Sequence, residues 1–132
     1  MDKKEEMTLE ELYTLMQGDY ADAKRRLMKD ERIEKYLRIF LRDETMQQLN
    51  DAVNHYDDNS DDTQQQRETI FRAAHTMKGV AANLSLTTLA HAASELTEQM
   101  RDRQNAPSAL LVDNLRKAYD TVIKAYSQKD ND

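Results

Sequence analysis

The fold can be argued outward from residues 70–84, which read Ile-Phe-Arg-Ala-Ala-His-Thr-Met-Lys-Gly-Val-Ala-Ala-Asn-Leu. Apolar residues recur here at spacings of four, three, four and three, at Ile70, Ala74, Met77, Ala81 and Leu84. This heptad-like spacing predicts a helix with one apolar stripe over residues 63–84. A helix with a single apolar stripe is not stable alone in water, so the pattern also predicts partner helices.

The partner helices are predicted by similar apolar stripes in the sequence before and after residues 63–84. The chain has only two glycines and one proline, and residues that favour helices fill most of it. The residues from Thr8 to Glu11 have the pattern of a capping box, which predicts the start of a short helix, and Gly18 predicts its end. The polar run 57–62 predicts a loop, and Pro107 predicts a turn. We expect long helices at 31–56, 63–84, 86–104 and 108–127, and short ones at 9–17 and 20–28.

These elements predict an all-α fold in a single domain over residues 1–132. Short connections between striped helices favour an antiparallel up-and-down four-helix bundle, with the short N-terminal helices packed over one end.

Composition excludes several classes of function. The 132 residues carry a net charge of −6, which does not suit binding to nucleic acid, and there is no cysteine for disulfides or thiolate sites. Two glycines are too few for a glycine-rich phosphate loop. No apolar run approaches the roughly 20 residues of a membrane span, and the polar start is unlike a signal peptide. We therefore expect a cytoplasmic protein without membrane insertion.

The three histidines do not have the spacing of a metal site. Di-metal bundles use Glu-x-x-His, but Ala52, Arg72 and Thr88 stand three residues before His55, His75 and His91. We predict no metal and no cofactor. His55 and His91 are interpreted as structural residues, with His91 exposed near Glu95.

His75 has the most informative surroundings. Lys78, Gly79 and Ala82 share its helix face, and Phe71 and Arg72 precede it by one turn. A glycine inside a helix costs about 1 kcal/mol relative to alanine. Gly79 therefore indicates close approach to the backbone, either by a neighbouring helix or by an incoming partner.

Residues 71–84 closely resemble the histidine-containing phosphotransfer (HPt) domain, whose signature is Ala-His-x-x-Lys-Gly, then small residues, then Asn-Leu. Positions before and after this run also resemble the family: Phe40, Leu49, Ala52, Leu89, Ala90 and Leu96. Two positions depart from it. Ser85 replaces the usual glycine and is expected to cap the next helix. Thr97 stands where the family often has Glu or Gln near the histidine.

The resemblance implies that His75 is phosphorylated on a ring nitrogen. It would accept the phosphoryl group from an aspartyl phosphate of a receiver domain and pass it to another receiver, in a hybrid sensor histidine kinase or a response regulator. Lys78 would offset charge on the phosphoryl oxygens, and Phe71, Arg72, Gly79 and Ala82 would form the partner surface. The carrier would have no ATP site, and it would have no catalytic metal of its own, because the receiver supplies the Mg²⁺. It would therefore not be an enzyme. We expect a free-standing monomer.

Two other interpretations stay open. The chain could be a helical interaction module whose His75 is never phosphorylated, or a bundle that binds a metal or cofactor. Transfer from a phosphorylated receiver distinguishes the first from a carrier, and a metal assay on purified protein tests the second.

Overall fold

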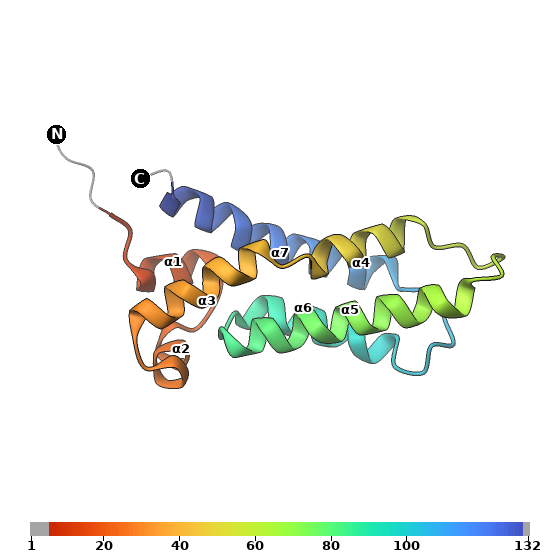
Figure 1. The fold of residues 1–132 in the computed structure, drawn as a ribbon, viewed down its shortest axis with the longest axis horizontal. Helices are drawn as coiled ribbons and strands as arrows, with labels where there is room; N and C mark the ends of the chain where they lie inside the picture. The colour runs from red at the N-terminus through yellow and green to blue at the C-terminus, as the bar shows by residue number, and fades with distance from the viewer. Residues whose placement is uncertain (1–5, 131–132) are drawn as a thin grey trace.

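The computed structural model describes residues 6–130, which form helices joined by short loops (Figure 1). Residues 1–5 and 131–132 of the predicted domain lie outside the described part. The described helices are α1 (Leu9–Met16), α2 (Tyr20–Leu27), α3 (Asp30–Arg42), α4 (Thr45–Asn54), α5 (Thr63–Asn83), α6 (Thr87–Gln99) and α7 (Ala109–Asp130). Residues 6–130 contain no β-strand, so the prediction of an all-α protein is confirmed.

The helix α5 lies between α4 and α6, and α6 packs in turn against α7. In Figure 1, α5 and α6 run side by side, while α3 and α4 follow one another along the other side of the molecule. The short helices α1 and α2 lie towards one end, where α1 packs on α7 and α2 on α3. This packing leaves one long face of α5 without a helix on it.

The predicted seam of α5 is buried along its whole length. Ile70, Ala74, Met77, Ala81 and Leu84 are each at most 3% exposed. The last helix, α7, also has one buried stripe, while Leu111 beside it is half-buried; the buried residues are Val112, Leu115, Ala118, Val122 and Ala125. Because this face of α5 is buried, the residues on the opposite face of the helix are directed outward.

The prediction of one helix over 31–56 is wrong, because the chain breaks into α3 and α4 at Asp43 and Glu44. Asp43 adopts an extended conformation (φ −71°, ψ 136°), and its Oδ1 accepts the backbone N–H of Thr45 at 2.7 Å. This local hydrogen bond offers the backbone an alternative to the helix. The apolar spacing on either side of the break gave no sign of it.

The prediction of a helix over 86–104 is also wrong, since α6 ends at Gln99. The amide of the Gln99 side chain bridges to the segment just before α7, donating to the carbonyl of Ala106 and accepting the N–H of Ser108, both at 2.9 Å. Arg103 has a φ of 54°, in the left-handed region that a helix cannot contain. The remaining long helix starts at Ala109 and continues to Asp130, three residues beyond its predicted end.

Ser85 does not cap α6, contrary to expectation. Its φ is 57°, and its hydroxyl donates to Asp22 Oδ2 at 2.6 Å. A glycine adopts this φ without strain, which explains why the resembling family has one here. Gly18 packs against the same turn: a Cβ on it would lie 2.8 Å from the carbonyl oxygen of Ser85. The turn between α5 and α6 is therefore held closely by the N-terminal helices.

Candidate functional site

His75 lies in the middle of α5 with its side chain exposed. The imidazole stacks on the ring of Phe71, one turn earlier, with centroids 6.0 Å apart and ring planes inclined by 10°. Lys78 is half-buried and Gly79 is exposed, one turn further along the helix. Since α5 buries its opposite face, these side chains are directed away from the core.

Gly79 faces open space. A Cβ built on this residue would have no other atom within 4 Å, apart from its own stretch of helix. A neighbouring helix therefore does not explain the glycine, and that alternative is wrong. Of the two explanations that the sequence left open, close approach by an incoming partner is the one that remains.

Glu98, an acidic side chain on α6, is coupled electrostatically to His75 and Lys78. Two hydrogen bonds from the Arg101 guanidinium, at 3.0 and 2.6 Å, hold the pKa of Glu98 below its usual range, and Lys78, together with the imidazolium form of His75, lowers this pKa further. Glu98 therefore lies within electrostatic reach of both predicted site residues.

Thr97, the residue before Glu98, is not part of the site. It is fully buried, and its hydroxyl donates to the carbonyl of Ala93 at 2.7 Å. The contact with the histidine that the resemblance attaches to this position is not made by Thr97. Glu98, the next residue of α6, is the one that is coupled electrostatically to His75.

Of the remaining predicted residues, Phe71 and Arg72 lie beside a second cluster of charges, and Ala82 does not. Arg72 is exposed and pairs with Glu68, one turn earlier on α5. Glu68 also accepts from Arg103 Nε at 2.9 Å, and this bond holds the pKa of Glu68 below its usual range. The guanidinium of Arg103 lies 3.7 Å from the centroid of Phe71. Ala82 is half-buried, on the side of Gly79 away from this cluster.

Sequence reasoning did not find Glu68, Glu98, Arg101 or Arg103. The last two lie beyond Gln99, where the end of the predicted helix is in fact a loop. The polar run from Arg101 to Asn105, two residues before Pro107, was the available signal for that loop.

The other histidines lie elsewhere. His91 is exposed on α6 with its Nε2 3.4 Å from Glu95, as predicted, and His55 ends α4 with Nδ1 2.8 Å from the carbonyl oxygen of Asp51. Within residues 6–130, no three side chains of the histidine or acidic type come close enough together to hold a metal ion. No helix in the same range is both long and apolar enough to cross a membrane.

The family model of the Hpt domain matches residues 35–125, more than half of the chain. The chain belongs to the Hpt domain family. No match to it was found among curated proteins or among solved structures. Membership confirms the resemblance stated from residues 71–84, and it implies phosphotransfer in phosphorelay signalling and interaction with receiver domains of two-component systems. Hpt domains are phosphocarrier modules rather than classical enzymes.

Proposed function

We propose that this Hpt domain carries a phosphoryl group on His75, taking it from the aspartyl phosphate of one receiver domain and delivering it to another. The observation that carries the proposal is the exposed imidazole of His75, with Lys78 and the open backbone at Gly79 on the same face of α5. The other exposed histidine on a helix, His91, has neither neighbour.

The reaction is an in-line displacement at phosphorus. The lone pair of one ring nitrogen of neutral His75 forms the nitrogen–phosphorus bond, and the bond between phosphorus and the aspartyl oxygen breaks. The aspartate leaves as a carboxylate, and the second ring nitrogen keeps its proton. Delivery to the next receiver is the reverse step, with that receiver's aspartate as the nucleophile.

Lys78 stabilises the transfer electrostatically. It lies one turn from His75, and its ammonium group offsets the negative charge that gathers on the phosphoryl oxygens. The Mg²⁺ of the reaction is supplied by the receiver domain, as the family resemblance implies, and the carrier needs no metal or cofactor of its own.

The surface around His75 suits a partner that approaches closely. The open space at Gly79 and the small side chain of Ala82 leave room for receiver loops, while Phe71 and Arg72 border the other side. We also propose that the helices form an antiparallel up-and-down bundle, and that the chain acts as a cytoplasmic monomer between a hybrid sensor histidine kinase and a response regulator.

The test is transfer from a pre-phosphorylated receiver domain, followed by mapping of the label. We expect an acid-labile, alkali-stable label on His75. His75→Gln abolishes it while helicity stays unchanged, and Lys78→Ala slows transfer but leaves His75 modifiable. His91→Gln is the matched control, since it removes an exposed histidine on a helix next to α5.

Two results contradict the proposal. Label retained in folded His75→Gln protein excludes His75 as the carrier. No label on wild-type protein, across several receivers, favours the interaction module that is never phosphorylated.

A further inference from the structure

The ring of His75 is in contact with a side chain that is itself held in place. Phe71 is half-buried on α5 and stacks on the imidazole, with the two ring planes nearly parallel. Arg103, from the loop between α6 and α7, places its guanidinium 3.7 Å from the Phe71 centroid, the shortest cation–π distance within residues 6–130. Such a contact stabilises one ring position of the aromatic residue.

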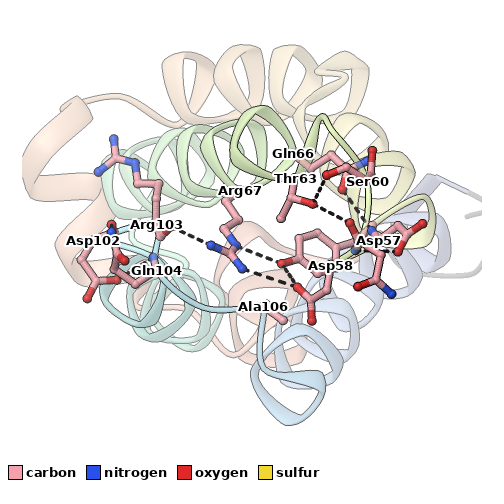
Figure 2. A network of polar contacts seen from close by, with 12 residues as sticks. Asp57, Asp58, Ser60, Thr63, Gln66, Arg67, Asp102, Arg103, Gln104 and Ala106 are labelled. Atoms are coloured by element: carbon pink, nitrogen blue, oxygen red, sulfur yellow. Dashed lines mark hydrogen bonds and ion pairs between the residues drawn. The ribbon is translucent and has the colours of Figure 1, made fainter.

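Arg103 is fixed at both its side chain and its backbone. Its Nε donates to Glu68, which lies one turn before Phe71 on the same helix. Its carbonyl accepts from Arg67 Nη1 at 3.3 Å, and Arg67 Nε in turn donates to the Tyr56 hydroxyl at 2.9 Å. Figure 2 shows Arg67 reaching between the α6–α7 loop and the segment that follows α4.

We propose that Arg103 is a positioning residue for phosphotransfer, acting on His75 through Phe71. The inference rests on the proposed phosphorylation of His75. An exposed imidazole on a helix can rotate between several orientations, and only some of them present the reacting nitrogen in line with phosphorus. By holding Phe71, Arg103 restricts the ring stacked on it, and this raises the fraction of His75 that is aligned for attack.

This proposal predicts a defect in the transfer step rather than in binding. In Arg103→Ala protein we expect the transfer rate at saturating phosphorylated receiver to fall about tenfold, because alignment is lost. The receiver concentration that gives half of that rate rises by a smaller factor, because Arg103 is already paired with Glu68. Arg103→Lys, which keeps a cation for Phe71 and Glu68, restores part of the rate.

A double-variant cycle tests whether the effect passes through Phe71. We expect Phe71→Leu to slow transfer to a similar degree, and Arg103→Ala to add nothing further in the Phe71→Leu background. Additive losses overturn the proposal, since they mean that Arg103 acts without Phe71, for example directly on the phosphoryl group.

The orientation of His75 can be measured without any phosphorylation. Three-bond couplings of the His75 side chain, measured by NMR, report its rotamer populations in the free protein. We expect averaging to increase in Arg103→Ala and Phe71→Leu but not in Arg116→Ala. Arg116 is the matched control, because its guanidinium joins α7 to α4 and bonds Asn50 and Asn54 rather than Phe71 or Glu68.

These measurements separate failure of the inference from failure of the proposed function. If wild-type protein takes no label on His75, the proposed function fails, while the couplings still decide whether Arg103 orders the ring. Unchanged couplings in Arg103→Ala overturn the inference even if His75 is phosphorylated. Equal slowing in Arg103→Ala and Arg116→Ala, with equal losses of thermal stability, reduces Arg103 to a structural role and also overturns it.

Discussion

The site depends on one residue that has no side chain. Gly79 lies inside α5, where glycine is unfavourable, and no other element packs against it. Neither helix formation nor core packing explains its presence. What remains is the space that it leaves beside His75, and the proposed function therefore predicts that stability and transfer respond in opposite directions to substitution.

Gly79→Ala and Gly79→Gln test this opposition. We expect both to raise the free energy of unfolding, by about 1 kcal/mol for alanine, because each favours the helix more than glycine does. Transfer from a phosphorylated receiver falls slightly with alanine and at least about tenfold with glutamine, as the larger side chain fills the space that we assign to the receiver. Denaturant unfolding and single-turnover transfer measure the two effects.

A control variant on another helix separates the effect of higher helix stability from the effect of filling the space at Gly79. Asn114→Ala, on the exposed surface of α7, raises helix propensity without touching α5. It should leave the transfer rate unchanged. If Gly79→Gln transfers as fast as wild-type protein, Gly79 does not contact the receiver.

At the scale of elements, the sequence predicted helices well and their ends poorly. The apolar stripe of α5 could be predicted because each helical turn brings the same face to the core, and His75, Lys78 and Gly79 follow from that one helix. The break at Asp43 is accompanied by a local hydrogen bond to Thr45, which leaves the apolar spacing on both sides intact. The spacing of apolar residues does not contain such information, because the bond is made by the Asp43 side chain.

The side chains that reach the site from other elements could not be predicted from the local sequence pattern around His75. Glu98 and Arg103 approach α5 only because α6 packs beside it and ends at Gln99. Their contacts with Arg101, Glu68 and Phe71 belong to the tertiary structure. Thr97 is the opposite case. The family resemblance placed this position near His75, but in the structure Thr97 is buried.

The junction of α2 with the α5–α6 turn gives a prediction on pH. The hydroxyl of Ser85, followed by Arg26, lowers the pKa of Asp22 from 3.8 to about 2. A carboxyl whose pKa is lower in the folded state contributes stability above its unfolded pKa, and loses it as pH falls through the folded value. We therefore expect Asp22→Asn to be less stable than wild-type protein at pH 6, with the difference shrinking between about pH 4 and pH 2.

Urea unfolding at pH 6, 4, 3 and 2 measures this difference. Asp113→Asn, an exposed aspartate of α7, controls for the loss of one negative charge. A gap between Asp22→Asn and wild type that stays constant down to pH 2 contradicts the assignment. Such a result would mean that Ser85 and Arg26 bond the protonated carboxyl equally well.

For the whole molecule, the charge near His75 differs in sign from the charge of the chain. The net charge is −6, yet Arg72, Lys78, Arg101 and Arg103 gather around α5 near His75. In the free protein Glu68 and Glu98 pair with three of these cations, Arg72, Arg101 and Arg103. The carrier is thus an acidic molecule with a locally cationic site, which matches a partner whose reacting pocket is acidic.

This distribution predicts how association responds to salt. Local attraction between the cations around His75 and an acidic receiver pocket should outweigh the repulsion of two acidic molecules, because charges beyond about 10 Å are screened at ordinary ionic strength. The second-order rate of transfer at low receiver concentration should then fall about tenfold between roughly 20 mM and 500 mM salt, while the rate at saturation changes little. Arg72→Gln should weaken the salt dependence, and Lys124→Gln, in the C-terminal half of α7, should not. A second-order rate that rises with salt would mean that the net charge governs the encounter, and the cations near His75 would then act only after binding.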